Sequence, residues 1–74
     1  MKEELIFASL GNRLRELRVE KNLMPRDLAE AIGEPETEII KLEAGLKAPT
    51  LTDLVLLTKR LGVTLSHLFE GLNI

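Results

Sequence analysis

The chain of 74 residues has no cysteine and only one histidine. Without cysteine, neither a disulfide nor a thiolate metal site can stabilise a domain of this size. A single histidine also leaves too few ligands for a metal cluster, so we expect no bound metal and no cofactor. Stability must come from the hydrophobic residues, which make up 45% of the chain. We expect no enzyme either, because so small a domain leaves little room for a substrate pocket.

Long hydrophobic runs and an excess of basic charge are also missing. No stretch approaches the roughly 20 apolar residues of a membrane span, and residues 1–10, M-K-E-E-L-I-F-A-S-L, form a poor signal peptide. We therefore expect a soluble, cytoplasmic protein that does not contact a membrane. The net charge of −2 gives no basic footprint for nucleic acid. This lowers the expectation of DNA binding but leaves it open, because a small basic face can lie on an acidic protein.

Hydrophobic periodicity, together with proline and glycine positions, predicts five helices. The expected segments are about 6–21, 25–32, 35–44, 51–61 and 65–70. Pro25 suits a first helical position, and Gly33 suits a helix end. Thr50 begins a T-x-x-D capping box before the fourth segment. The predicted fold is one all-α domain spanning residues 1–74, a compact five-helix bundle.

The apolar residues that recur at helical spacing are expected to form the core. They are Phe7, Leu10, Leu14, Leu17, Leu28, Ala29, Ile32, Ile39, Leu42, Leu51, Leu54, Leu57, Leu61, Leu65, Leu68 and Phe69.

Residues 23–42 have the apolar spacing of a helix-turn-helix hinged on Gly33. Five blocks in register include this segment and flank it. The blocks are L-G-N-R-L-R-E-L-R (10–18), D-L-A-E-A-I-G (27–33), I-I-K-L-E-A-G (39–45), P-T-L-T-D-L (49–54) and R-L-G-V-T-L-S-H-L-F (60–69). Over about residues 10–70 the chain resembles the Cro/repressor-type, or xenobiotic-response-element, family of helix-turn-helix transcriptional regulators. The resemblance implies a lambda-repressor-like fold whose third helix, about 35–44, enters the major groove of DNA.

The resemblance also implies which side chains of the third helix face DNA: Glu36, Thr37, Ile40 and Lys41. Thr37 can reach a phosphate or a thymine methyl group, and Lys41 a phosphate or guanine. Glu36 can accept a hydrogen bond only from cytosine N4, and Ile40 can contact only a thymine methyl group.

Further cations could face DNA: Arg13, Arg26 and Lys47. Lys47 is favoured because the loop after the third helix commonly lies along the DNA backbone in this family. For each of these cations, a solvated surface charge is the alternative interpretation.

Two residues at the start of the helix-turn-helix depart from the family pattern, which has a small hydroxyl residue and then glutamine. Met24 is a poor helix cap, and Pro25 has neither an amide hydrogen nor a polar side chain. Glu34 and Glu38 add negative charge near the third helix. This charge either repels phosphate or simply interacts favourably with the helix dipole.

Arg18 and Glu43 match a pair that many family members join as a salt bridge, and Arg18 lies at the border of the first helix's apolar stripe. We expect a structural ion pair between them. His67 matches a polar surface position.

Apolar residues without an evident core position lie at both termini and in the fourth helix: Leu5, Ile6, Leu56, Leu72 and Ile74. A contiguous group of this kind suggests a partner. We expect a homodimer that uses the termini, about 1–9 and 65–74, with the last two helices.

The predicted function is sequence-specific DNA binding by a transcriptional regulator, a dimeric repressor on an operator. The alternative is a helix-turn-helix used for protein–protein contact through Met24, Pro25 and Ile40, surrounded by glutamates.

Overall fold

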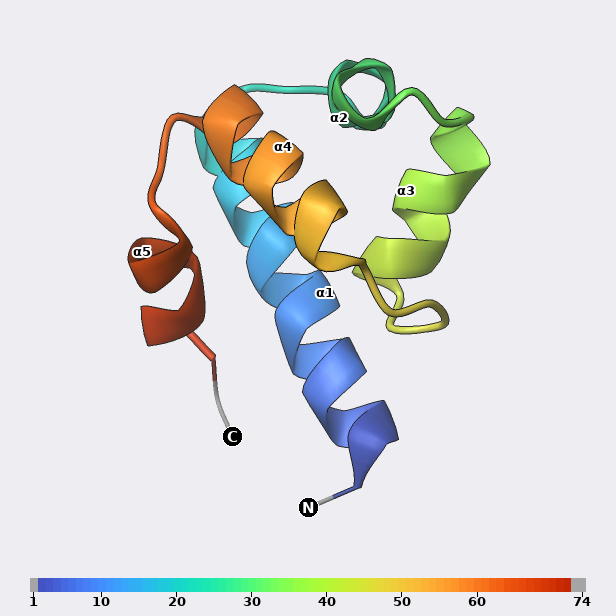
Figure 1. The fold of residues 1–74 in the computed structure, drawn as a ribbon, viewed down its shortest axis with the longest axis vertical. Coiled ribbons are helices and arrows are strands. Elements are labelled where there is room, and N and C mark those ends of the chain that lie inside the picture. Colours follow the sequence, from blue (N-terminus) through green and yellow to red (C-terminus); the bar gives the residue numbers. More distant parts are fainter. Residues whose placement is uncertain (1, 73–74) are drawn as a thin grey trace.

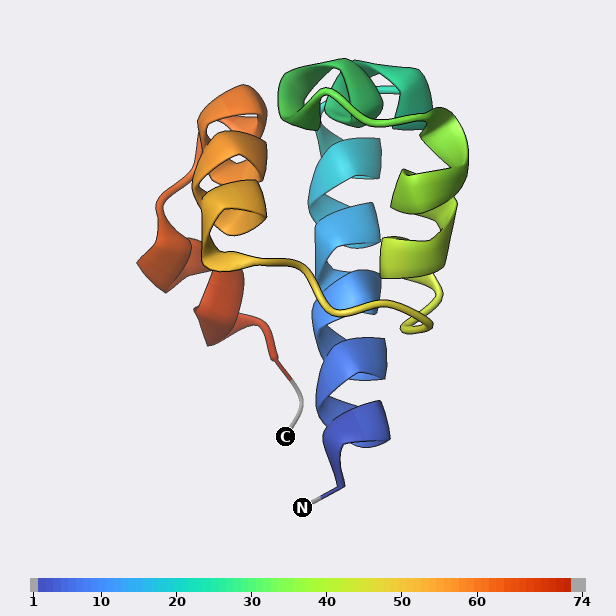
Figure 2. The ribbon, with the colours of Figure 1, turned by 45° about the vertical axis from the view of Figure 1, so that its right-hand side comes forward.

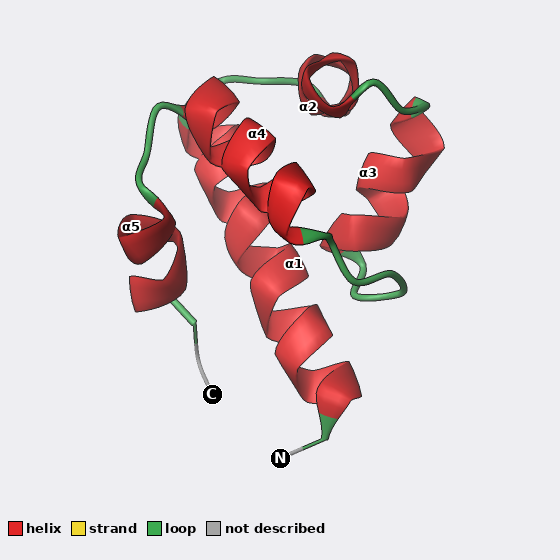
Figure 3. Cartoon of the chain, in the orientation of Figure 1, coloured by secondary structure: helices red, strands yellow, loops and turns green. Residues whose placement is uncertain are grey.

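The computed structural model describes residues 2–72, and within that range it contains five α-helices and no β-strand (Figure 3). The helices are α1 (Glu3–Glu20), α2 (Pro25–Ile32), α3 (Glu36–Glu43), α4 (Leu51–Leu61) and α5 (Leu65–Glu70). The predicted all-α, five-helix architecture is confirmed. The first helix begins about three residues earlier than expected, and Glu3 and Glu4 in its first turn interact favourably with the helix dipole.

The long helix α1 is the element around which the others are arranged (Figure 1). Helix α3 packs along one side of it and α5 packs on the other, while α2 packs against both α3 and α4. The loop between α3 and α4 passes in front of α1 when the molecule is turned (Figure 2). The first turns of α1 extend beyond the other helices in both views. None of the helices in residues 2–72 is both long and apolar enough to cross a membrane.

The core is built almost entirely from leucine. Its buried members are Leu10, Leu14, Leu17, Leu28, Ala29, Ile39, Leu42, Leu54, Leu57, Leu61 and Leu68. Each was predicted from helical spacing. Ile32 and Leu65 pack against this core while remaining partly exposed.

Some apolar residues lie elsewhere than predicted. Leu51 is 72% exposed, so its assignment to the core is wrong: it occupies the first position of α4, before the helix turns its apolar side inward. Phe69 is exposed as well, whereas Leu72, expected to be free, packs partly against the core. Ile74 lies outside the described residues.

Gly11 permits the close approach of α1 to α3. A Cβ atom at this position would overlap the carbonyl oxygens of Leu42 and Glu43 at the end of α3. These are backbone atoms, which have no rotamer through which to move away. The absence of a side chain at residue 11 therefore sets how closely α3 lies against α1.

Candidate nucleic-acid interface

Helix α3 has two faces of opposite character. Ile39 and Leu42 are buried, with 1% and 2% of their surfaces exposed. The remaining side, which we call the outer face, consists of Glu36, Thr37, Ile40 and Lys41, and all four are exposed. The structure therefore brings together the four side chains that the resemblance assigned to DNA, on one surface that no other part of residues 2–72 covers.

A charged pair holds the C-terminal end of α3 to α1. Arg18 Nε donates to Glu43 Oε2 at 2.7 Å, and Arg18 Nη2 donates to Glu43 Oε1 at 3.0 Å. Arg18 Nη1 also donates to the carbonyl of Leu23, at 2.9 Å, just before α2 begins. The side chains of Arg18 and Glu43 are only 12% and 10% exposed, and the hydrogen bond that Arg18 donates to Glu43 raises the pKa of Arg18. One guanidinium thus fixes α1, the end of α3 and the entrance to α2 together.

The beginning of α2 is capped from inside the helix. The Met24 side chain accepts no hydrogen bond, consistent with its expected weakness as a cap. Asp27, however, accepts a hydrogen bond from the Met24 backbone amide at 2.7 Å. This half of a capping box was missed in the sequence, although an acidic residue three positions after the cap is its usual signal. Gly33 ends α2 with a φ of 68°, as predicted for a left-handed helix end.

Glu38 joins the outer face to the loop that follows α3. Its Oε2 lies 2.6 Å from Lys47 Nζ, and its Oε1 lies 3.6 Å from Lys41 Nζ. The hydrogen bond from Lys47 lowers the pKa of Glu38, and the same bond raises the pKa of Lys47. Both lysines predicted to meet DNA are therefore paired with one carboxylate in the free protein. Neither the repulsion nor the dipole interpretation of Glu38 included this contact.

Arg26 is exposed at the second position of α2 and, among the described residues, makes no hydrogen bond or ion pair. It is free to meet an anion approaching this end of the helix-turn-helix.

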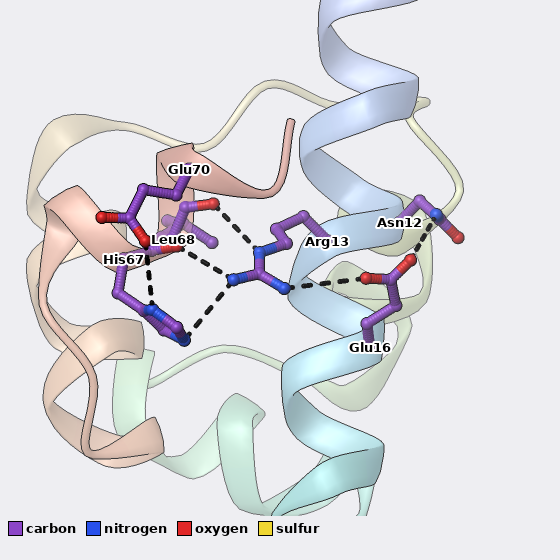
Figure 4. Close-up of polar contacts among 6 residues, drawn as sticks. All are labelled: Asn12, Arg13, Glu16, His67, Leu68 and Glu70. Atoms are coloured by element: carbon purple, nitrogen blue, oxygen red, sulfur yellow. Dashed lines mark hydrogen bonds and ion pairs between the residues drawn. The ribbon is translucent and has the colours of Figure 1, made fainter. Parts of the chain in front are cut away.

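Arg13, interpreted from the sequence as either a DNA-facing cation or a solvated surface charge, lies against α5 in the structure. Its Nε donates to the Leu68 carbonyl at 3.2 Å and its Nη2 to the His67 carbonyl at 3.0 Å (Figure 4). The side chain is 14% exposed. Arg13 is thus neither a solvated charge nor a DNA-facing cation, because it satisfies carbonyl groups of α5. His67 is exposed as expected, and its ring lies beside Arg13 and Glu70.

These features define a class of protein: a small helical domain that presents the second helix of a helix-turn-helix on an open surface, held from behind by a core and a buried ion pair. A helix-turn-helix family model matches residues 14–68. The chain belongs to this family, the Cro/repressor-type helix-turn-helix transcriptional regulators, which bind DNA.

Solved structures of regulators have the same fold. The restriction-modification controller protein C.AhdI from Aeromonas hydrophila is 30% identical, with a TM-score of 0.81 over 86% of this chain and 97% of that one. The clp gene regulator ClgR from C. glutamicum is 27% identical, with a TM-score of 0.84 over 89% of this chain and 86% of that one. The controller protein C.Esp1396I is 26% identical, with a TM-score of 0.78 over 88% and 84%. No curated protein matches the chain significantly in sequence.

Proposed function

We propose that this protein is a sequence-specific repressor that binds its operator as a homodimer, with α3 in the major groove. The observation that carries the proposal is the outer face of α3, which is open, lies on a helix held rigidly from behind, and belongs to a family whose members bind DNA. In this proposal Thr37 and Lys41 contact bases or phosphates, and Glu36 accepts from cytosine. A regulator of this kind acts in the cytoplasm, where its operator is.

Positive charge at the edges of α3 supplies the phosphate contacts in this proposal. Lys47 lies in the loop after α3 and Arg26 lies at the start of α2, so the two approach the DNA backbone from opposite ends of the helix-turn-helix. Ile40 adds apolar contact with a thymine methyl group. Because Pro25 has no amide hydrogen to donate at the start of α2, the phosphate contact that its backbone would otherwise make is missing. We therefore expect a modest affinity that depends on few cations.

The proposed dimer uses apolar residues that the bundle leaves exposed. Leu5 near the N-terminus, Leu56 on α4 and Phe69 on α5 are exposed, while Ile6 is half-buried. These positions agree with the expected involvement of the termini and the last two helices. Light scattering at tens of micromolar protein measures the mass, and a monomer at that concentration contradicts the dimer.

The DNA contacts are tested with a random-sequence duplex and fluorescence anisotropy. We expect measurable binding at about 50 mM salt that weakens steeply as salt rises, because released counterions drive the affinity. Lys41→Glu and Lys47→Glu are each expected to abolish this binding with little change in melting temperature. Lys59→Glu on α4 makes the same charge change at an exposed site outside the proposed DNA interface, and is expected to retain binding. Absence of wild-type binding at about 50 mM salt and high micromolar protein contradicts the proposal.

A second function is favoured by one feature beside the outer face. Pro25, Ile40 and Ala44 line a shallow hollow of about 280 Å³, whose other walls are Arg15, Arg18 and Glu43. Ile40 and Met24 are both more than half exposed. A hollow whose walls are half apolar and half charged accommodates a protein side chain better than a phosphate backbone. Protein–protein contact is therefore the alternative, and it predicts no salt-dependent binding to duplex DNA.

A further inference from the structure

The carboxylate of Glu38 divides its two oxygens between two lysines from different segments. Lys47 comes from the loop between α3 and α4 and lies at 2.6 Å, and Lys41 comes from α3 itself and lies at 3.6 Å. The Glu38 side chain is 21% exposed, whereas the lysines are 42% and 54% exposed. The Glu38 side chain is thus less exposed than either of the lysine side chains that it contacts.

Glu38 occupies the border between the two faces of α3. At about 100° per residue, it follows Lys41 around the helix and precedes the buried Leu42. Its lysine partners are two of the three cations on which the proposed DNA contacts depend, the third being Arg26. Whatever binds these lysines must therefore do so in the presence of Glu38.

A carboxylate and a phosphate offer a lysine the same chemistry, an anionic oxygen that accepts a charge-assisted hydrogen bond. The pKa of Glu38 is lowered, so this carboxylate is charged at neutral pH. Glu34 and Asp53 also raise the pKa of Lys47, but only by attraction at a distance, whereas Glu38 contacts it. A DNA phosphate that takes Lys47 must replace the Glu38 oxygen or share the ammonium group with it.

We propose that Glu38 is an internal competitor of DNA phosphate for Lys41 and Lys47, and that it thereby lowers the affinity of this protein for DNA irrespective of sequence. The inference rests on the proposed DNA binding. Through Lys47, whose proposed contact is with phosphate alone, Glu38 becomes a determinant of specificity. A carboxylate that weakens phosphate contacts increases the share of the affinity that depends on base contacts, and therefore on sequence.

The decisive variant is Glu38→Gln, which preserves the size of the side chain and removes its charge. We expect the slope of log K against log salt to become steeper by about 0.9, the equivalent of one additional phosphate contact. Over the range from about 1 M to about 50 mM salt, this slope corresponds to about 15-fold tighter binding of a random-sequence duplex. A purely structural Glu38, which only secures the loop, would lower the melting temperature on substitution and would not make the salt slope steeper.

The matched control is Glu34→Gln. Glu34 carries the same charge just before α3 and is exposed, and among the described residues it contacts no lysine. Removing its charge relieves long-range repulsion of phosphate and removes a weak attraction to Lys47. Salt screens both, so we expect a gain of less than about twofold. Equal gains in the two variants overturn the proposal, because the effect would then be general repulsion rather than competition for the lysines.

A double-mutant cycle with Lys47→Met tests whether the effect passes through the lysine. In the wild type, Lys47 is paired with Glu38, so its loss should weaken binding of the random duplex less than it does in the Glu38→Gln background. Equal losses in both backgrounds contradict the competition.

The two proposals fail in different ways. Wild-type binding without any gain in folded Glu38→Gln overturns the competitor role alone and leaves the DNA-binding proposal standing. Absence of salt-dependent binding in the wild type and in Glu38→Gln overturns both.

Discussion

The inner and outer faces of the eight-residue helix α3 differ in what their side chains contact. On the inner face, Ile39 and Leu42 are buried and the adjacent Glu43 accepts two hydrogen bonds from Arg18. On the outer face, neither Glu36 nor Thr37 forms a side-chain hydrogen bond or ion pair within residues 2–72. Contacts that stabilise the helix and groups available to a partner are therefore separated by half a turn. The comparison predicts that substitutions on one face change stability and that substitutions on the other change binding.

The largest expected difference is between two aliphatic residues of α3. Leu42→Ala should lower the free energy of unfolding by about 3 kcal/mol, since it leaves a cavity in a closely packed core. Ile40→Ala should change it by less than about 0.5 kcal/mol, because Ile40 is 57% exposed. Urea unfolding followed by circular dichroism measures both. Similar losses in the two variants would show that Ile40 is covered in solution.

Two carboxylates provide a smaller contrast of the same kind. Glu43→Gln removes the charge opposite a largely buried guanidinium, and we expect a loss of about 2 kcal/mol in unfolding free energy. Glu36→Gln should leave stability unchanged and should alter binding only to duplexes that place a cytosine beside it. Thermal unfolding and a panel of duplexes measure the two effects. If Glu43→Gln is as stable as the wild type, the ion pair does not anchor α3.

The smallest expected effect concerns the border between the faces. Because the pKa of Glu38 is lower in the folded protein than in the unfolded chain, its ionised form stabilises the fold at neutral pH. That contribution is lost as the pH falls from the ordinary glutamate range through the lowered value. Carboxyl NMR during an acid titration should show Glu38 protonating below the ordinary range, and Lys47→Met should move its pKa upward. No upward movement would mean that Lys47 does not hold the carboxylate in solution.

Local patterns were sufficient to predict much of the fold. The five helices follow from leucine spacing and from the residues that cap helices, such as Thr50, whose hydroxyl accepts from the Asp53 amide at 3.0 Å. Leu51 was misplaced because a residue in the first turn continues the apolar spacing although no neighbouring helix covers it. Periodicity reports which side of a helix is apolar, not how far the neighbouring helix extends.

The site was predictable only in part, because several of its contacts join segments that are distant in the sequence. The outer face was assigned by resemblance, which compares positions one at a time. The Glu38–Lys47 contact depends on the path of the loop after α3, and the bonds from Arg13 to the α5 carbonyls span more than fifty residues. Every residue type has a backbone carbonyl, so the sequence does not indicate which residues accept hydrogen bonds from Arg13.

Gly11 has a consequence for recognition as well as for packing. Because Gly11 has no side chain, the carbonyls at the end of α3 lie directly against α1. Residue 11 therefore sets how far the outer face of α3 projects from the rest of the domain. A methyl group there would push α3 outward without changing any residue that is proposed to face DNA. In the proposed complex, the depth to which α3 enters the groove therefore depends on a residue of α1, a helix outside the proposed interface.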